Sequence, residues 1–323
     1  MIGVWVENGA VTVRDDLPAP TAGQGDAVVS VQLAGLCGTD LALVEGYRDF
    51  VGIPGHEFVG IVDEGPPGWK GARVASEINV TCGSYPPESD RCKACGWGRT
   101  THCERRTAIG IFGRDGVFAE RVALPVANLH RVPVLVPNDK AVFVEPLAAA
   151  FRVLEQVDIG EGTRVVVIGP GRLGQLVARA VATTGARPTL AGRSEASLVR
   201  GRRVGIASLM TDEIEAGTYD VAVDCTGSPE GFAAARRALR PAGTLVLKST
   251  YSSPLELDAT SLAVDEIRVI GSRCGPFPRA IEALSSGTVD VEDLIDDRFP
   301  LTDAPAAFTK AAEPGVAKVL LEA

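Results

Sequence analysis

The stretch Arg164-Val165-Val166-Val167-Ile168-Gly169-Pro170-Gly171-Arg172-Leu173-Gly174 decides the fold of this chain. After one arginine, its first half is a run of β-branched apolar residues, which is typical of a strand buried on both faces. Its second half has the glycine spacing G-x-G-x-x-G. Apolar side chains then recur at helical spacing from Leu173 to Thr184, and a second apolar run over residues 187–191 follows Gly185. The pattern therefore predicts a strand, a glycine turn, a helix and a second strand.

This order predicts a dinucleotide-binding site. The glycines permit a tight turn and let the backbone approach a pyrophosphate, which binds the free N–H groups at the positive end of the helix. The alternative is a purely structural turn, since a chain with 36 glycines will contain some G-x-G-x-x-G spacings by chance. The residues predicted to contact the cofactor are Gly169, Pro170, Gly171, Arg172, Leu173 and Gly174 in the turn, with Gly192, Arg193, Ser194, Thr226 and Gly227 after later strands.

The end of the second strand indicates which dinucleotide binds. An enzyme that uses NAD places Asp or Glu roughly 20 residues beyond the glycines, where the carboxylate accepts a hydrogen bond from the ribose 2′-hydroxyl. This chain has Ala191-Gly192-Arg193-Ser194 there, without a carboxylate. A cation and a hydroxyl suit a 2′-phosphate, so we predict NADP. The alternative is that Arg193 is solvated and that the enzyme accepts either NADP or NAD.

Length and composition limit the class of protein. A chain of 323 residues suits two domains, and 46% apolar residues with a mean hydropathy of +0.15 predict a folded globular protein. A net charge of -9 disfavours binding to nucleic acid, which needs clustered Lys and Arg. No apolar run reaches the ~18–20 residues that span a bilayer, and the N-terminus lacks a basic region followed by a long apolar one. We therefore expect no membrane association and a cytoplasmic location.

The first 145 residues contain several candidate metal ligands. Alternation of apolar and polar residues predicts antiparallel strands, and the segment Gly35-Leu36-Cys37-Gly38-Thr39-Asp40 follows them. Further on, the segment Pro54-Gly55-His56-Glu57 places a histidine and a glutamate directly before another predicted strand. Glu145 lies in an otherwise apolar sequence, where a buried carboxylate requires a partner. The alternative for His56 is a structural histidine in the core.

A cysteine-rich segment predicts a second metal site. Cys92, Cys95 and Cys103 are closely spaced, and Cys82 precedes them beyond a polar interruption from Ser84 to Arg91. Four thiolates complete a tetrahedral zinc site with no open position, so such a site is structural. One alternative is two disulfides, which the absence of a secretion signal disfavours. The other is His102 in place of Cys82.

The remaining segments divide the chain into domains. Strands are predicted at residues 220–224, 243–248 and 267–272, followed by a helix at 279–285, an acidic linker at 290–297 and a strand at 317–321. The last strand matches the β-rich first third, to which we expect the chain to return. The predicted domains are a dinucleotide-binding domain over 141–272 and a catalytic domain over 1–140 and 273–323, with a structural-zinc lobe at 82–103.

Together these motifs resemble the medium-chain dehydrogenase/reductase superfamily and its zinc-dependent alcohol and polyol dehydrogenases. The resemblance extends over nearly the whole chain, through Glu145-Pro146-Leu147-Ala148 to the closing Lys318-Val319-Leu320-Leu321. It implies an α/β fold with a Rossmann doubly wound parallel sheet and a β-rich catalytic domain like chaperonin-10. It also implies assembly into homodimers or homotetramers. We expect that assembly to pair sheet edges near residues 243–251.

The resemblance also implies roles for individual residues. Cys37, His56 and Glu145 would hold a catalytic zinc, Glu57 would be able to enter its coordination shell, and the Thr39 hydroxyl would relay the alcohol proton. Cys82, Cys92, Cys95 and Cys103 would hold the structural zinc. The chain departs from many relatives at Ala42, where they have a histidine that passes the proton outward, so the relay is shorter or uses water.

The leading functional hypothesis is a zinc-dependent alcohol dehydrogenase. It would transfer a hydride between NADP, or NAD, and a secondary alcohol or polyol or the corresponding ketone. The first alternative is a zinc-free quinone or enone reductase of the same fold, whose relatives generally lack the Cys37, His56 and Glu145 set. The second is a non-catalytic NADP-binding sensor or scaffold. Candidates to line the substrate pocket are Tyr47, Phe50, Trp97, Phe112 and Phe277.

Overall fold

The computed structural model describes residues 1–85, 90–251 and 254–323. The chain forms two compact units, which we call unit 1 (Met1–Glu145 with Ala280–Ala323) and unit 2 (Pro146–Arg279). The domain boundaries predicted from the sequence lie at 140 and 272, a few residues before these divisions. Residues 86–89 of the interruption in the cysteine-rich segment lie outside the described residues.

Unit 2 is built on one six-stranded sheet. Its strands are β10 (Val165–Ile168), β11 (Thr189–Gly192), β12 (Ala207–Met210), β13 (Tyr219–Asp224), β14 (Leu239–Leu247) and β15 (Arg268–Gly271). They pair in parallel in the order β12-β11-β10-β13-β14-β15. The helices of this region are α4 (Val144–Gln156), α5 (Arg172–Ala182), α6 (Glu195–Arg203), α7 (Pro229–Ala238), α8 (Ala259–Val264) and α9 (Phe277–Ser285).

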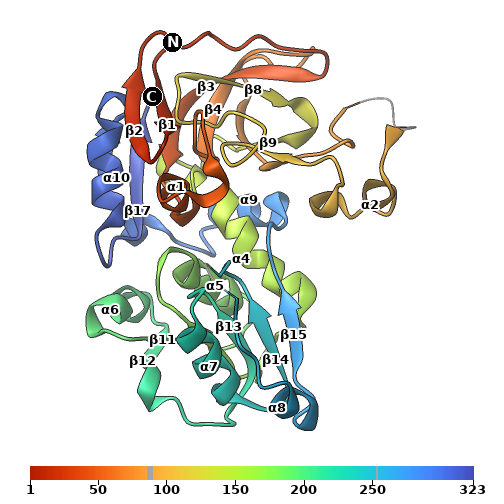
Figure 1. The fold of residues 1–323 in the computed structure, drawn as a ribbon, viewed down its shortest axis with the longest axis vertical. Helices are drawn as coiled ribbons and strands as arrows, with labels where there is room; N and C mark the ends of the chain where they lie inside the picture. The colour runs from red at the N-terminus through yellow and green to blue at the C-terminus, as the bar shows by residue number, and fades with distance from the viewer. Residues whose placement is uncertain (86–89, 252–253) are drawn as a thin grey trace. The chain divides into compact units, whose positions relative to one another are not determined.

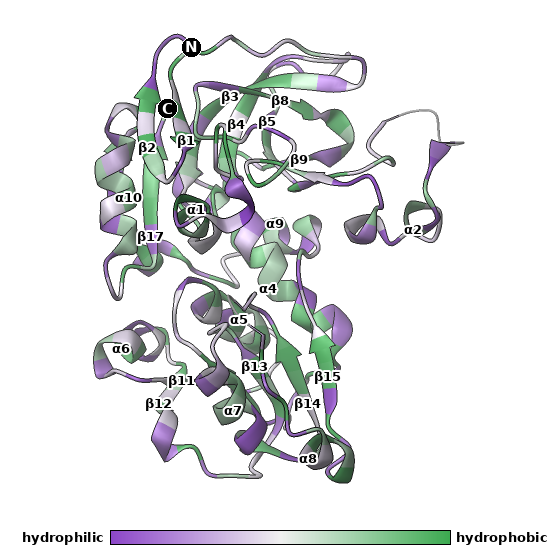
Figure 2. Cartoon of the chain, in the orientation of Figure 1, coloured by the Kyte–Doolittle hydropathy of each residue, from purple (hydrophilic) through white to green (hydrophobic). Residues whose placement is uncertain are grey.

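The strand order places a ligand crevice in unit 2. The order reverses between β10 and β13, and in doubly wound sheets the dinucleotide binds at this reversal, outside the carboxyl ends of the strands. All four residues of β10 are buried, as its apolar sequence predicts. Figure 1 shows β13, β14 and β15 side by side, and Figure 2 colours β14 and β15 largely as hydrophobic. The Ser228 side chain accepts a hydrogen bond from the N–H of Gly231 and so begins α7.

Unit 1 is β-rich. Its strands are β1 (Gly3–Glu7), β2 (Ala10–Arg14), β3 (Asp26–Gly35), β4 (Glu57–Glu64), β5 (Arg73–Ser76), β6 (Asn79–Val80), β7 (Thr107–Ala108), β8 (Arg121–Pro125), β9 (Leu129–Arg131), β16 (Ile295–Pro300) and β17 (Lys318–Glu322). Seven of them form one sheet, in the order β16-β17-β3-β4-β5-β9, with β8 also paired to β3. Its helices are α1 (Gly38–Val44), α2 (Lys93–Gly96), α3 (Asn138–Ala141) and α10 (Ala304–Ala312).

The last strand completes the sheet of unit 1. β17 pairs antiparallel with β3, with Leu320 opposite Gly35 and Leu321 opposite Ala34. The rings of Phe118 and Phe308 meet edge to face at 6.0 Å in the core beneath. Such a pair contributes about 0.5–1.5 kcal/mol beyond the apolar area that it buries. The C-terminal segment therefore belongs to the fold of the first third.

Two local predictions were wrong, and one helix was missed. Residues 290–297 are not a linker, because they contain a 3-10 turn (Glu292–Leu294) and the start of β16. The helix α10 was not predicted. The segment 243–251 is not at a sheet edge, since β14 pairs with β13 on one side and with β15 on the other, so that β12 and β15 form the edges.

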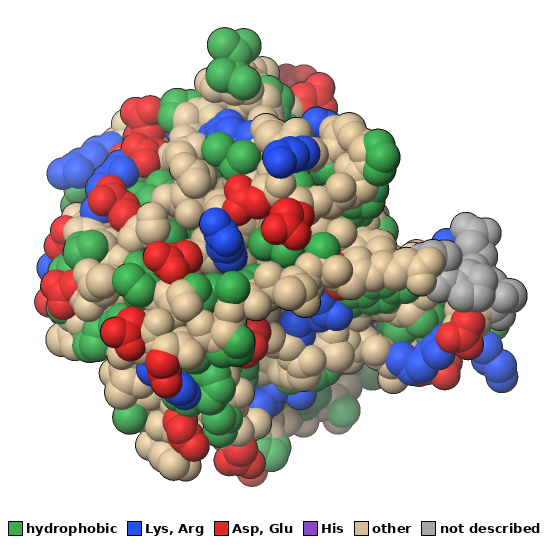
Figure 3. All heavy atoms as spheres, turned by 90° about the horizontal axis from the view of Figure 1, so that it is seen from above, with side chains coloured by type: hydrophobic (Ala, Val, Ile, Leu, Met, Phe, Trp, Pro, Cys, Tyr) green, Lys and Arg blue, Asp and Glu red, His purple; other side chains and the backbone are tan. Residues whose placement is uncertain are grey.

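The surface carries charges of both signs. On the face seen in Figure 3, acidic and basic side chains are interspersed rather than separated into one basic area. Within the described residues, none of the helices is long and apolar enough to cross a bilayer.

Candidate functional site

Cys37, His56 and Glu57 form a compact set of potential metal ligands in unit 1. The Cys37 sulfur, a ring nitrogen of His56 and a carboxylate oxygen of Glu57 all lie within 4.8 Å of one another. Cys37 directly precedes α1, and Glu57 is the first residue of β4. Ligand atoms around one zinc lie roughly 3–4 Å apart, as follows from bonds of ~2.0–2.3 Å in a tetrahedron. The set therefore fits a single ion, and two of its members, Cys37 and His56, are among the ligands that the resemblance implies.

Asp40 holds this set together. It is fully buried, and its carboxylate accepts hydrogen bonds from the N–H groups of Cys37 at 2.8 Å and Gly55 at 3.2 Å. One of its oxygens lies 3.6 Å from Nδ1 of His56. Burial disfavours the charged imidazolium, but Asp40 and Cys37 outweigh it and raise the pKa of His56 well above its ordinary value. The sequence analysis did not assign Asp40 to the site, although a carboxylate beside a ligand histidine commonly helps to orient its ring.

Lys318 is a second residue that the sequence analysis did not assign to the site. Its ammonium, at the start of β17, forms an ion pair with the carboxylate of Glu57 and donates to the carbonyl of Leu36 at 3.2 Å. Both charged side chains are almost completely buried. The ammonium also lies 5.4 Å from the centre of the Phe143 ring. A charged residue in the apolar sequence of the last strand was the only signal for this contact.

Thr39 and Glu145 lie close to the set in different ways. The Thr39 hydroxyl is 3.8 Å from the Cys37 sulfur. Glu145 lies in the first turn of α4 and is 8% exposed, and its charge contributes to the raised pKa of His56. Among the described residues, the set that lies within 4.8 Å contains Glu57 rather than Glu145. The role predicted for Glu145 as third ligand therefore stays a prediction.

The four cysteines of the lobe converge on one point. Cys82, Cys92, Cys95 and Cys103 each place a sulfur within 4.8 Å of the other three. The sulfur of Cys103 lies 3.6 Å from that of Cys82 and 3.8 Å from that of Cys92. Four sulfurs at ~2.3 Å from a tetrahedral zinc are about 3.8 Å apart, whereas a disulfide bond measures about 2.05 Å. The geometry therefore fits the predicted zinc and not the alternative of two disulfides, and His102 lies outside the set.

The surroundings act in opposite directions on two thiols of the lobe. The backbone around Cys95 and Glu104 donates to the Cys92 sulfur and lowers the pKa of that thiol to about 6. Burial acts in the opposite direction on Cys95, whose pKa it raises to about 12. A divalent cation is what permits four sulfurs in contact to ionise together, because the ion neutralises their charge.

The glycine turn in unit 2 has the shape that a pyrophosphate requires. Gly169 has a φ of +94°, and a Cβ on Gly174 would lie 1.9 Å from the carbonyl oxygen of Gly169. The close approach of α5 to the turn thus excludes a side chain at 174. A Cβ on Gly171, which precedes α5, would meet no protein atom within 4 Å. The protein leaves that side of the turn open in front of the free N–H groups of the helix.

The other predicted cofactor residues lie at the carboxyl ends of strands. Gly192 ends β11, and the exposed residues Arg193 and Ser194 follow it and precede α6. Thr226 and Gly227 follow β13, the neighbour of β10. The Thr226 hydroxyl and N–H both donate to the buried carboxylate of Asp224, at 2.6 and 2.8 Å. The fold thus brings the predicted residues together at the carboxyl ends of the parallel strands.

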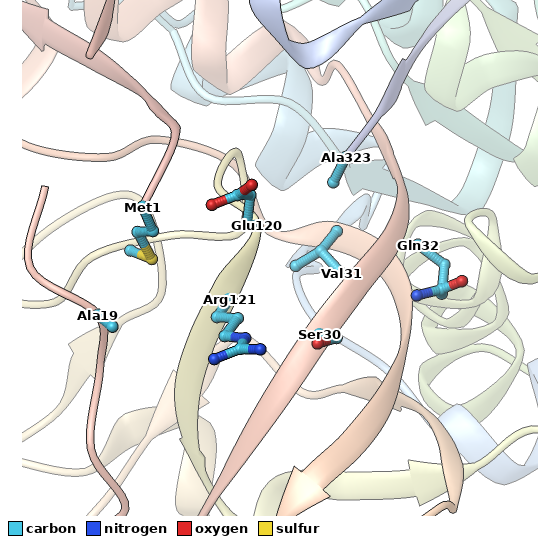
Figure 4. A pocket seen from close by; sticks show the side chains of 8 residues that line it. All are labelled: Met1, Ala19, Ser30, Val31, Gln32, Glu120, Arg121 and Ala323. Atoms are coloured by element: carbon cyan, nitrogen blue, oxygen red, sulfur yellow. The ribbon is translucent and has the colours of Figure 1, made fainter. Parts of the chain in front are cut away.

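Two hollows lie apart from these residues. In unit 1, a cavity of about 450 Å³ is lined by the two terminal residues, Met1 and Ala323, and by residues of β3 and β8 such as Ser30 and Arg121 (Figure 4). In unit 2, one of about 640 Å³ lies between α7 and the segment that leads into α8. None of the predicted site residues lines either of them.

Comparison with known proteins gives a consistent result. Residues 23–134 match the alcohol dehydrogenase GroES-like domain, and residues 173–286 match the zinc-binding dehydrogenase domain. The chain is 31% identical to an L-threonine 3-dehydrogenase of Streptomyces coelicolor, over 95% of this chain and 94% of the relative.

Two solved structures share the whole fold. A protein from Sinorhizobium meliloti, described as a zinc-binding dehydrogenase and solved with NADP, is 30% identical with a TM-score of 0.90, over 100% and 99% of the two chains. A short chain alcohol dehydrogenase from Escherichia coli CFT073, solved with NADH, is 25% identical with a TM-score of 0.91 over the same shares. The chain therefore belongs to the medium-chain dehydrogenase/reductase superfamily, as a zinc-dependent oxidoreductase of its alcohol and polyol dehydrogenase family.

Proposed function

We propose that this enzyme uses NADP to oxidise a secondary alcohol, such as a polyol, to the ketone, and catalyses the reverse reaction. The alcohol loses a hydride to NADP⁺ and a proton to solvent, giving ketone, NADPH and H⁺. The observation that carries the proposal is the convergence of Cys37, His56 and Glu57 in unit 1 of a chain from this family. Unit 1 would supply the catalytic residues and unit 2 the cofactor site.

Cys37, His56 and one carboxylate would hold the catalytic zinc. A zinc with three protein ligands and an open position polarises a substrate oxygen and lowers the pKa of a bound hydroxyl. Two carboxylates compete for the third position. We assign that position to Glu145, which the resemblance to the family implies there, and keep Glu57, which is paired with Lys318, as the carboxylate that can replace it.

The chain's own residues would direct the proton. Asp40 keeps Nδ1 of His56 on its carboxylate side, which leaves Nε2 for the metal. The Thr39 hydroxyl, next to the Cys37 sulfur, accepts the alcohol proton and passes it on. Since Ala42 replaces the outward histidine of many relatives, the proton leaves Thr39 through water.

The cofactor would bind across the glycine turn. The open face at Gly171 accommodates the pyrophosphate, and Arg193 with Ser194 would bind the 2′-phosphate. In the described residues no carboxylate pairs with Arg193, so its charge is available. The relative from S. meliloti was solved with NADP and that from E. coli with NADH, so both cofactors occur among similar proteins.

One set of measurements tests the proposal. Elemental analysis should find two zinc ions per chain, and C37S should retain one of them while losing turnover of secondary alcohols. The variant R193E should lower kcat/KM for NADP⁺ at least tenfold without an equal loss for NAD⁺. Turnover of enones by a protein that lacks the first zinc would refute the zinc-dependent mechanism, and absence of turnover with any alcohol would refute the enzyme assignment.

Assembly would occur through the edge of the unit 2 sheet. Among the described residues, β15 pairs with a single neighbouring strand, β14, and its other side is open. Val269 on β15 is 43% exposed. A second copy can pair with such an edge and cover it. Light scattering of the purified protein should give a dimer or a tetramer, and a proline at 269 should dissociate it, because proline lacks the N–H that an edge strand donates.

A further inference from the structure

Two arginines flank one aromatic ring in unit 1. The guanidinium of Arg48 lies 4.8 Å from the centre of the Phe112 ring and 5.3 Å from that of Tyr47. The guanidinium of Arg106 lies 5.0 Å from the Phe112 ring, so the two cations are less than about 10 Å apart. The ring face attracts both guanidinium groups and so holds them near each other.

Arg48 is available to a ligand. It is exposed, and within the described residues no carboxylate forms an ion pair with it. The nearest acidic residue in sequence is Asp49, which is also exposed and forms no ion pair with another residue of the described ranges. Arg106 donates to the Asn79 side chain at 2.8 Å, which fixes its position beside the same ring.

The backbone at this position is strained. Arg48 has a φ of +66° and Asp49 a φ of +45°, although neither is a glycine. Two consecutive residues in this left-handed region are unfavourable for side chains with a Cβ. Conformations of this kind persist where the surroundings hold them, and they are concentrated at ligand sites.

The cluster lies close to the Cys37, His56 and Glu57 set, within the same unit. The segment that carries Phe112 packs on the residue before His56, because a Cβ on either Gly110 or Gly116 would come within 2.3 Å of the Gly55 carbonyl oxygen. Consecutive Cα atoms are 3.8 Å apart, so the Cα atoms of Phe112 and His56 are separated by about 15 Å at most. An arginine side chain and a substrate of a few carbons can bridge that distance.

We propose that Arg48, with Arg106 beside it on Phe112, binds an anionic substituent of the alcohol substrate, a carboxylate or a phosphate. A guanidinium binds either group with two parallel hydrogen bonds, and its contact with the ring restricts its position. The substrate class is then a hydroxy acid or a phosphorylated polyol rather than a neutral polyol. The inference rests on the proposed dehydrogenase function and specifies its substrate.

The test compares three substrates with one carbon skeleton. Zinc-loaded enzyme saturated with NADP⁺ is assayed with D-glucitol, D-gluconate and D-glucitol 6-phosphate. Saturation with cofactor prevents these anions from occupying the phosphate sites of unit 2. Calorimetry with the same three compounds measures binding whether or not they are turned over, and the two anions distinguish a carboxylate site from a phosphate site.

We expect both kcat/KM and the binding affinity to be about 10- to 100-fold higher for at least one of the two anions than for glucitol. This is the size of effect that a hydrogen bond to a charged group produces. In R48Q this ratio falls at least tenfold, mainly through KM, and R48K restores part of it. R14Q is the matched control, since Arg14 stacks on Trp5 at 5.1 Å but is paired with Asp16.

Equal affinity for glucitol and both anions, or an equal ratio in R48Q and R14Q, would overturn the inference. Oxidation of glucitol with that outcome would leave the dehydrogenase function intact. An anion preference in binding without any turnover would support the anion site and contradict the proposed reaction instead.

Discussion

Replacement of Lys318 by methionine tests the buried ion pair beneath the proposed zinc site. Lys318→Met removes the cation that faces Glu57 and leaves that carboxylate buried, with 2% of its side chain exposed. Loss of one partner from a buried pair costs about 3–5 kcal/mol, because the remaining charge has neither solvent nor a counter-ion. At roughly 2–4 °C per kcal/mol for a domain of this size, the melting temperature should fall by about 6–20 °C.

A double-mutant cycle isolates the interaction. In E57Q/K318M neither charge of this pair remains, so the double variant should be more stable than the sum of the two single effects predicts, by about 2 kcal/mol. Urea unfolding of zinc-free protein measures all four free energies. Lys310→Met is the control, because Lys310 pairs with Glu313 in the same unit at 2.6 Å but both are substantially exposed, and such pairs contribute at most about 1 kcal/mol.

Zinc adds a second measurement. A divalent cation beside Glu57 supplies the charge that methionine removed, so the penalty of K318M should shrink when zinc saturates the protein. A K318M variant as stable as K310M, or a cycle in which the two single effects simply add, would refute the reasoning that these charges depend on one another.

Three further predictions concern other parts of the molecule. Cys103→Ser removes one of four converging sulfurs, so elemental analysis should find one zinc fewer per chain. Gly174→Ala places a Cβ against the Gly169 carbonyl and should therefore lower the melting temperature. The same variant should bind NADPH at least tenfold more weakly, as measured by fluorescence titration. Asp220→Asn should cost about 1 kcal/mol or less of unfolding free energy at pH 7, because Asp220 pairs with Arg240, and this cost should disappear in acid.

The predictions for Gly174 and Asp220 each have an outcome that would contradict them. Gly171→Ala, whose Cβ meets no protein atom, should lower NADPH affinity without changing the melting temperature, and equal behaviour of the two alanine variants would contradict the assignment. For Asp220, burial raises the pKa, but the bonds from Arg240 and the Arg164 N–H outweigh it and lower the pKa. Its stabilisation is therefore present above about pH 4 and is lost as the pH falls through the lowered value. A cost independent of pH would exclude this explanation.

The sequence by itself determined the features that depend on neighbouring residues. The strand, glycine turn and helix at 165–182 were predictable because burial gives an apolar run and the turn excludes a Cβ at Gly174. The four cysteines of the lobe were predictable because short spacing brings their sulfurs together. Both features need little information from the rest of the chain.

The tertiary structure alone decided the features that join distant segments. Glu57 and Lys318 are 261 residues apart, and the register of β17 on β3 places one beside the other. That register depends on the packing of the whole sheet, and no local periodicity encodes it. For the same reason, the structure rather than the sequence showed that β15 forms a sheet edge and that Arg48 and Arg106 meet on the ring of Phe112.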